Sequence, residues 1–299
     1  MKKIILIDTS NLFYRAFFAI PQNFISPKGQ IVNAVFGSCS VMLAILKNEQ
    51  PDFIFFFKDT KEKTFRHNEY NQYKAGRAKI PDELVQQLPL IDDLLASFSL
   101  PVFSYPGFEA DDLIATAVQK FNAPQKEFLI LSTDQDLFAL VQENVFIIQN
   151  TKGGNFKRID SKQIKEKFAI TPQQIADFKA IAGDASDNIP GIFKIGKKGA
   201  AELLQQFNTL ENIKNNFHNV PAKFYKKLEN NLEKALKMKK LIKLNSSVPL
   251  SLDLTQGSIN NISYQKIDYF LKNLGFNALR RRLINIPLFK KDQDQMCFF

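Results

Sequence analysis

Short apolar segments alternate with amphipathic ones along the first half of the chain. Runs rich in Ile, Phe and Leu predict buried strands at 3–8, 53–59, 101–105, 127–133 and 145–149. Between these runs, apolar residues at helical spacing predict helices at 33–48, 81–98, 109–121 and 133–141. Nearly continuous apolar strands that alternate with helices are typical of a mostly parallel sheet covered by helices on both faces. The pattern therefore predicts an α/β fold.

The strand pattern ends near residue 160, and mostly helical patterns follow. Residues 161–184 predict two helices that are interrupted before Pro172. Glycine and proline positions in 184–199 predict a hairpin between helices, and a last helix is expected near 264–284. We therefore expect two units, an α/β core and a helical subdomain, with the bounds 1–160 and 161–299.

Composition narrows the function classes. The chain has 299 residues, of which 45% are hydrophobic, but no run of about 18 uncharged apolar residues that would predict a membrane span. Two distant cysteines and two histidines disfavour a disulfide framework, a zinc site or a histidine-based triad. The first apolar run is short and ends at Asp8, which favours a strand over a signal peptide. We expect a monomeric, cytoplasmic protein with no membrane partner.

The formal net charge is +10, which suggests a polyanionic partner. Lysine, Asn, Ile and Phe are abundant, however, as in chains from A+T-rich genomes, and this composition alone explains part of the excess. The charge therefore adds only modest support for a nucleic-acid partner.

Carboxylates gather at the predicted strand ends. Asp8, Asp59 and Asp134 follow three of the predicted strands. In an open parallel sheet, ligands bind outside the carboxyl ends of the strands, so these acids should meet along one rim. Six further acids occur nearby in the sequence. Glu109, Asp111 and Asp112 begin the helix after the third predicted strand, Asp136 follows Asp134, and the predicted hairpin starts with Asp184 and Asp187.

Each acid alone has a simple structural explanation as a helix cap, a turn residue or a match to a helix dipole. Capping requires one acid per helix, however, and here two or three occur together. Crowded carboxylates have raised pKa values unless a cation neutralises them. Mg²⁺ or Mn²⁺ takes carboxylate oxygens and retains waters, and two such ions about 3.5–4 Å apart suit displacement at a phosphodiester. The joint pattern therefore predicts a divalent-metal site.

The hairpin predicted at 184–199 combines glycines with lysines. Gly191 and Gly196 permit a tight turn whose backbone N–H groups can meet phosphate at the start of the next helix. Lys194, Lys197 and Lys198 add positive charge there. This arrangement matches a helix–hairpin–helix element that binds DNA.

The segment 64–81 is polar, basic and aromatic, although it directly follows a core strand. It could form a solvated loop, or a helical arch in which cations bind phosphates and tyrosines stack on bases. The side chains that would do so are Arg66, Tyr73, Lys74, Arg77 and Lys79.

Five blocks together form a recognisable signature: LIDTSNLFYRAFFA, FFKDTKEKTFRHNEYNQYKAGR, GFEADDLIAT, LSTDQDLFALV and GDASDNIPGIFKIGKKGAAELL. In these blocks the sequence resembles the 5′ nuclease (flap endonuclease) family, most of all the N-terminal 5′→3′ exonuclease domain of bacterial DNA polymerase I. The resemblance extends over nearly the whole chain and implies a PIN-like core that cleaves DNA at 5′ ends, flaps or nicks with divalent metal.

The resemblance also implies roles for single residues. All nine acids of the rim, the helix start and the hairpin match the family's acidic positions. Lys74 and Arg77 match basic arch residues that contact the scissile phosphate, with Tyr73 as a stacking partner. The family's hairpin binds K⁺ through backbone carbonyls, which here belong to residues 191–196. One departure is Lys58, a charged residue beside Asp59 where family members often carry an uncharged one.

Setting aside these nine of the 30 acidic residues leaves 21 against 40 basic ones, which indicates an acidic cleft on a basic body. Other readings are a non-catalytic module that binds branched DNA, which loss of metal acids would favour, and a ribonuclease on a related fold. We expect a stand-alone nuclease rather than an excised polymerase domain.

Overall fold

The computed structural model describes residues 1–289. Six strands form one sheet in the order β3-β2-β1-β4-β5-β6, and all neighbouring pairs are parallel except β5 and β6. The strands are β1 Lys2–Asp8, β2 Phe53–Phe57, β3 Val102–Phe103, β4 Lys126–Leu131, β5 Val145–Asn150 and β6 Phe156–Ile159. The predicted mostly parallel α/β fold is confirmed.

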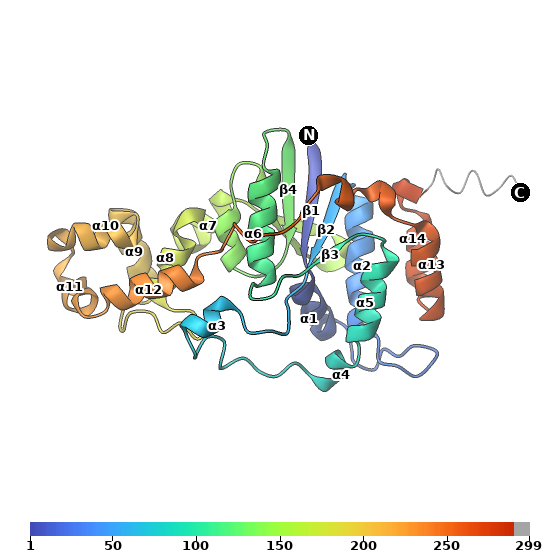
Figure 1. The fold of residues 1–299 in the computed structure, drawn as a ribbon, viewed down its shortest axis with the longest axis horizontal. Coiled ribbons are helices and arrows are strands. Elements are labelled where there is room, and N and C mark those ends of the chain that lie inside the picture. Colours follow the sequence, from blue (N-terminus) through green and yellow to red (C-terminus); the bar gives the residue numbers. More distant parts are fainter. Residues whose placement is uncertain (290–299) are drawn as a thin grey trace, which may run out of the picture.

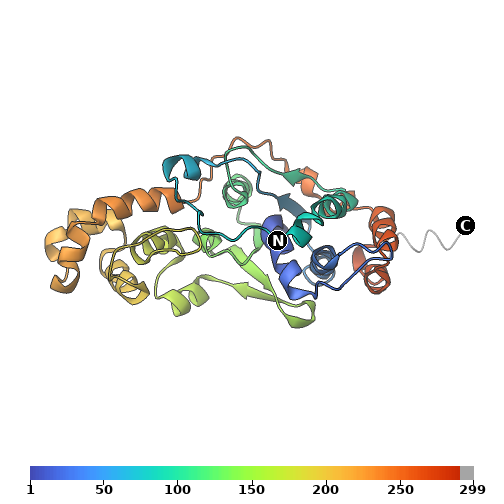
Figure 2. The ribbon, with the colours of Figure 1, turned by 90° about the horizontal axis from the view of Figure 1, so that it is seen from below.

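Helices cover both faces of the sheet (Figures 1 and 2). Side chains alternate along β1, so Ile4 and Leu6 pack toward one face whereas Ile5 and Ile7 pack toward the other. The helices of the first part of the chain are α1 Thr9–Ala19, α2 Asn33–Asn48, α3 Phe65–Glu69, α4 Asp82–Val85, α5 Leu88–Ser97 and α6 Ala110–Phe121. Helix α6 lies on the first face, and α1, α2 and α5 lie on the second.

The helices of the second part are α7 Ser161–Phe168, α8 Ile175–Ala182, α9 Lys197–Phe207, α10 Leu210–Asn215, α11 Ala222–Glu229, α12 Leu232–Ile242, α13 Tyr264–Asn273 and α14 Asn277–Ile284. Helices α9 to α12 form one end of the molecule (Figure 1). Helices α13 and α14 lie at the other end, where they contact α5 and α2. The chain after residue 160 therefore divides in space, and only its first part extends away from the sheet.

Several elements differ from their predicted form. The helix expected at 81–98 is two helices, because Pro89 near the start of the second one has no N–H to continue the hydrogen-bond ladder back to Val85. The helix expected at 133–141 is a short 3₁₀ helix, Asp136–Leu140, and the last helix is interrupted at Gly275, whose φ is +71°. Helix α1 and strand β6 were not predicted. Helix α1 does bury Leu12, Phe13, Ala16 and Phe17 at helical spacing, whereas the four residues of β6 are too short a segment to show an apolar period.

Candidate active site

The carboxyl ends of β1, β2 and β4 bring three acids to one rim of the sheet. Asp8 ends β1 and caps α1, where its Oδ1 accepts from the Asn11 N–H at 3.1 Å. The Asp59 Oδ1 accepts from the Ala110 N–H at 2.9 Å, which joins the end of β2 to the start of α6. The Asp134 Oδ1 accepts from the Asp136 N–H at 2.9 Å. Parallel strands thus place these acids together, as their positions in the sequence predict.

Burial and like charge perturb this rim. Burial, together with repulsion from Asp59, raises the pKa of Asp8 to about 7, although the Ser132 hydroxyl donates to its Oδ2 at 3.0 Å. Burial also raises the pKa of Asp111 well above its usual value, with repulsion from Asp112 and Glu109 opposing the nearby Arg66. The protein's own structure therefore penalises the charged form of these acids.

A second group of acids lies where the 3₁₀ helix after β4 meets the loop after α8. Asp136, Asp184 and Asp187 each offer a carboxylate oxygen, and these oxygens lie within 4.8 Å of one another. The Lys179 ammonium contacts Asp136 and lies 2.5 Å from the Asp184 Oδ2. Burial raises the pKa of Asp136 to about 7 even though Lys179 opposes the change.

The two groups form one ring. Asp8 is close enough to Asp59 and Asp134 to be repelled by both. Asp136 is likewise repelled by Asp134 and by Asp187. The ring closes through Tyr73, whose hydroxyl lies 3.3 Å from the Asp187 Oδ2 and 3.0 Å from the Glu109 Oε2. Eight acids thus surround one acidic centre: Asp8, Asp59, Glu109, Asp111, Asp134, Asp136, Asp184 and Asp187.

Two basic residues of the segment 64–81 reach this ring. The Lys74 ammonium donates to the Glu109 Oε1 at 2.6 Å. The backbone of Lys74 is in the left-handed region, with φ of +56°. The Arg77 guanidinium donates to the Asp187 Oδ1 at 2.7 Å and to the Ser186 carbonyl oxygen at 3.3 Å. Both cations therefore lie where a phosphate at the acidic centre would meet them.

The prediction that Arg66 contacts DNA is wrong. Its side chain is 1% exposed, and its guanidinium pairs with both oxygens of Asp112 at 2.6 and 2.7 Å. The Nε donates to the Leu241 carbonyl oxygen at 2.8 Å. Arg66 therefore joins α3 to α6 and to the end of α12, and it is out of reach of a ligand.

The same pair corrects the assignment of Asp112 as a metal ligand. Asp112 is fully buried, and its Oδ1 also accepts from the Asn245 N–H at 2.8 Å. Both carboxylate oxygens are thus occupied by protein donors and face away from solvent. Asp112 stabilises the start of α6, where Glu109 and Asp111 lie.

Tyr73 is also not the exposed stacking residue that was predicted. It is 5% exposed, and its hydroxyl lies between two acids of the ring. The arch prediction is correct only in part, because 64–81 contains the single five-residue helix α3 and otherwise consists of turns and extended chain. Lys79 is exposed in that extended part.

The hairpin prediction agrees with the structure. Residues 183–196 connect α8 to α9, and a Cβ at Gly191, whose φ is +65°, would lie 2.4 Å from the Gly183 N. The chain therefore doubles back here only with glycine. Three lysines are exposed on the hairpin and the start of α9, namely Lys194, Lys197 and Lys198.

The donor set of the ring suits a hard divalent cation. All eight members are carboxylates, the ligand type that Mg²⁺ and Mn²⁺ prefer. Asp8 and Asp111 have raised pKa values and no ion pair with a lysine or arginine among residues 1–289. A bound cation would remove this penalty, so the residues present fit such a group.

Two family models match the chain. The 5′-3′ exonuclease N-terminal resolvase-like domain matches residues 3–169, and the 5′-3′ exonuclease C-terminal SAM fold matches residues 170–265. The chain belongs to the 5′-3′ exonuclease family.

Relatives of this family member include a 5′-3′ exonuclease of Aquifex aeolicus, 33% identical over 96% of each protein. DNA polymerase I of Bacillus subtilis is 34% identical over 94% of this chain, but the match covers only 32% of that polymerase. Among solved structures, a T5 5′-exonuclease with bound zinc has a TM-score of 0.68 at 20% identity, covering 95% of this chain and 98% of that one. The catalytic core of Rad2 with DNA substrate has a TM-score of 0.59 at 17% identity, covering 96% and 93%. These structures share the fold.

One charged residue of this exonuclease-family site was missed by sequence reasoning. Lys179 lies on α8, five residues before Asp184. In the sequence it is indistinguishable from a lysine on the exposed surface of a helix. Its position relative to Asp136 depends on how α8 packs against the 3₁₀ helix, and the pattern of residues along the chain does not predict this packing.

Among residues 1–289 no helix is long and apolar enough to span a membrane.

Proposed function

We propose that the chain hydrolyses DNA phosphodiesters at 5′ ends, flaps or nicks as a divalent-metal-dependent 5′ nuclease. The observation that carries this proposal is the closed ring of eight carboxylates with Lys74 at its edge. Membership of the 5′-3′ exonuclease family supports the same class of reaction.

We assign Mg²⁺ or Mn²⁺, as two ions, to the ring. Asp8, Asp59, Asp111 and Asp134 would hold one, and Asp136, Asp184 and Asp187 the other, with Glu109 between the two groups. A divalent cation there supplies charge neutralisation for a phosphate and lowers the pKa of a bound water. The carboxylates would hold this charge in place.

Lys74 and Arg77 would act on the phosphate itself. Each is bound to a carboxylate of the ring, so each has a fixed direction before DNA arrives. Preorganised cations stabilise charge that develops in the transition state without reorganisation at that moment. Lys74 is the more enclosed of the two, with a side chain 19% exposed against 49% for Arg77. We therefore assign transition-state stabilisation mainly to Lys74.

The basic surface would hold the DNA. The N-terminus of α9 follows the hairpin and has no side-chain cap, so its N–H groups are free to bind a backbone phosphate. Lys194, Lys197 and Lys198 surround it, and Lys79 extends the positive surface from the other side. We place K⁺ at the backbone carbonyls of residues 191–196, and we propose a monomeric protein that acts in the cytoplasm.

A direct test compares cleavage of a labelled 5′-flap duplex with that of a blunt duplex, with Mg²⁺ and with EDTA. We expect metal-dependent release of the flap and slower attack on the blunt end. DNA binding with no cleavage at any metal concentration would identify a non-catalytic module. Faster cleavage of a matched RNA flap would instead identify a ribonuclease.

A further inference from the structure

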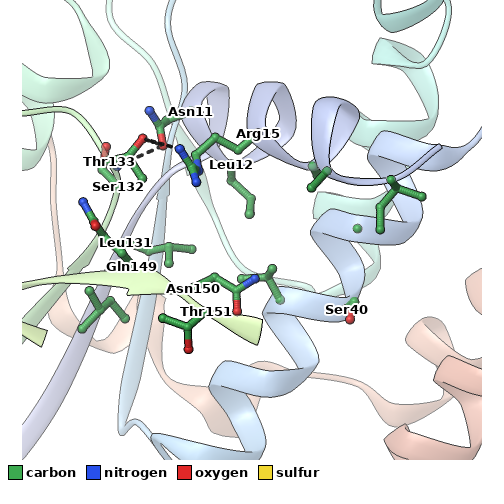
Figure 3. Close-up of a pocket in the computed structure, with 16 residues that line it drawn as sticks. Asn11, Leu12, Arg15, Ser40, Leu131, Ser132, Thr133, Gln149, Asn150 and Thr151 are labelled. Atoms are coloured by element: carbon green, nitrogen blue, oxygen red, sulfur yellow. Dashed lines mark hydrogen bonds between the residues drawn. The ribbon is translucent and has the colours of Figure 1, made fainter. Parts of the chain in front are cut away.

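A cavity of about 480 Å³ opens between α1 and α2, at the carboxyl ends of β4 and β5 (Figure 3). Ser132 in its wall donates to the Asp8 Oδ2 at 3.0 Å, and the Arg15 Nη1 lies 3.4 Å from the Thr133 Oγ1 at the same wall. The cavity therefore belongs to the active site. The hairpin 183–196 has a separate exposed feature, which the proposed phosphate contacts do not use.

Phe193 lies at the tip of the hairpin. It is 75% exposed, more than any other aromatic side chain in the part of the chain that the structure describes. Its neighbours Ile192 and Ile195 are each only 3% exposed. The Ile192 N–H donates to the Ile181 carbonyl oxygen at 2.7 Å. The Ile195 N–H donates to the Ile192 carbonyl oxygen at 2.9 Å, which closes a turn at the tip. The turn is thus fixed on both sides, and it holds the phenyl ring in solvent.

Helix α11 supports this turn from one side. The Lys227 ammonium donates to the Lys194 carbonyl oxygen at 3.3 Å. Phe224 of the same helix lies against α9, where a Cβ at Gly199 would come within 3.1 Å of its ring. Lys194 has φ of +60°, a left-handed conformation that suits glycine and costs free energy in a lysine. Strain of this kind at an exposed position points to a role for the tip outside the fold itself.

The surroundings of Phe193 are positively charged. Residues 188–201 contain three lysines and no acidic residue. The three lysines, Lys194, Lys197 and Lys198, are all exposed, and the Lys194 ammonium lies 5.2 Å from the centre of the Phe193 ring. A second copy of the chain at this tip would place like charges against one another, which disfavours self-association here. A polyanion with an accessible apolar surface fits both the ring and the lysines.

Duplex DNA has such a surface in its minor groove, where sugars and base edges lie between two rows of phosphates. Proteins that bind this groove often insert phenylalanine or another apolar side chain into it. The start of α9 is the proposed phosphate contact and lies four residues beyond Phe193. A duplex held there brings its sugars to the tip of the hairpin.

We propose that Phe193 enters the minor groove of the bound duplex and packs against sugars and base edges, while Lys194 contacts a phosphate at the edge of the groove. The inference rests on the proposed DNA-binding function and adds to it an apolar contact. Such a contact releases no counterions, so it strengthens binding without adding to its salt dependence.

Two single variants separate the apolar contact from the charged one, namely Phe193→Ala and Lys194→Ala. Fluorescence anisotropy in EDTA gives their dissociation constants for a nicked duplex over a range of salt concentrations. Tyr269→Ala is the matched control, because Tyr269 is an aromatic residue that is 68% exposed on α13, at the other end of the molecule. Phe193→Leu keeps apolar volume at the tip. Hydroxyl-radical footprinting at saturating protein shows which sugars of the minor groove are covered.

Phe193→Ala should weaken binding about 10-fold with an unchanged salt slope, because a phenyl ring neutralises no phosphate. Lys194→Ala should flatten the logarithmic salt dependence by about 0.9. Phe193→Leu should recover most of the lost affinity, and Tyr269→Ala should bind like the wild type. In Phe193→Ala one short group of sugars should become accessible to the radical, while the rest of the footprint remains.

Three results would overturn the assignment: wild-type affinity in Phe193→Ala, a footprint that this variant leaves unchanged, or a salt slope that flattens as much as in Lys194→Ala. If Phe193→Ala lowers the thermal midpoint, Phe193→Gln replaces it, since glutamine fills space at the tip without an apolar surface; wild-type affinity in that variant overturns the assignment equally. A wild-type chain with no affinity for duplex DNA would overturn the DNA-binding proposal as well. Tight binding that does not depend on Phe193 overturns this inference alone.

Discussion

The two halves of the acidic ring are neutralised in different ways. Glu109, Asp136, Asp184 and Asp187 pair with cations of the chain itself, namely Lys74, Lys179, Arg77 and Arg66. The other half, Asp8, Asp59, Asp111 and Asp134, forms no such pair within residues 1–289. The pKa values of Asp8 and Asp111 are raised as a result of burial and repulsion. Burial also raises the pKa of Asp136 in the paired half to about 7, so Lys179 compensates only part of the penalty there. The unpaired half has no such compensation within residues 1–289 and depends on a cation from outside the chain.

The largest expected effect tests the unpaired half. Asp111→Asn or Asp134→Asn should lower single-turnover flap cleavage by about 1,000-fold or more, equivalent to about 4 kcal/mol, because each removes a metal-binding charge. The dissociation constant for DNA should change less than threefold, since the basic surface is intact. Asp93→Asn, an exposed acid on α5, serves as the control. Near-wild-type cleavage in either ring variant would falsify the metal-centre assignment.

Lys179→Met tests the paired half. Lys179 is 11% exposed and bridges Asp136 and Asp184, so its removal leaves buried carboxylates without a partner. In EDTA the free energy of unfolding should fall by about 3 kcal/mol. Mg²⁺ should recover more stability in this variant than in the wild type. Chemical denaturation with and without Mg²⁺ measures both, with the exposed Lys165→Met as control. Equal metal effects in variant and wild type would show that Lys179 does not substitute for a cation.

Lys74 separates catalysis from binding at the edge of the ring. Lys74→Ala should reduce single-turnover cleavage by at least ~100-fold, about 2.7 kcal/mol, with only a few-fold change in DNA affinity. Lys74→Arg should recover little, because a planar guanidinium does not replace a compact ammonium. Lys79→Ala, in the exposed part of the same segment, should affect binding alone. Equal losses of binding and cleavage in Lys74→Ala would make Lys74 a phosphate anchor.

The raised pKa values predict how stability depends on pH without metal. Asp8 and Asp136 have folded-state pKa values of about 7, above those of the unfolded chain, so the folded state binds protons more tightly. Stability is therefore highest below about pH 4 for these groups and is lost as the pH rises toward 7 and above. Between pH 5 and pH 8 the thermal midpoint in EDTA should fall by roughly 5 °C or more, and saturating Mg²⁺ should remove most of this fall. A midpoint that Mg²⁺ leaves unchanged at pH 8 contradicts convergence of the carboxylates on one cation site.

The smallest expected effect concerns the basic surface outside the ring. Lys197→Ala with Lys198→Ala should weaken binding to all duplex sequences alike and flatten the logarithmic salt dependence by up to about 1.8. Lys266→Ala with Lys272→Ala makes the same charge change on α13, at the opposite end of the molecule, and should leave the slope unaltered. An identical slope in both double variants means that the hairpin lysines do not meet DNA.

Burial explains most of the errors in the sequence prediction of the site. Arg66, Tyr73 and Lys74 occur within nine residues of one another, and all three were read as DNA-facing. Only Lys74 keeps its side chain at the edge of the acidic centre, because Arg66 and Tyr73 turn inward to satisfy buried acids. In a polar segment, the sequence does not show whether a basic or aromatic side chain is buried against a carboxylate or exposed to a ligand.

The sequence by itself determined the α/β class and the convergence of Asp8, Asp59 and Asp134, because parallel strands necessarily end at one edge of their sheet. It also determined the hairpin, because glycine is required where the chain approaches itself at Gly191. The tertiary structure alone decided that Asp112 serves Arg66, that Lys179 enters the ring, and that a cavity lies beside Asp8. These features depend on packing between elements that are distant in the chain, and local residue patterns do not encode which side chains such packing brings together.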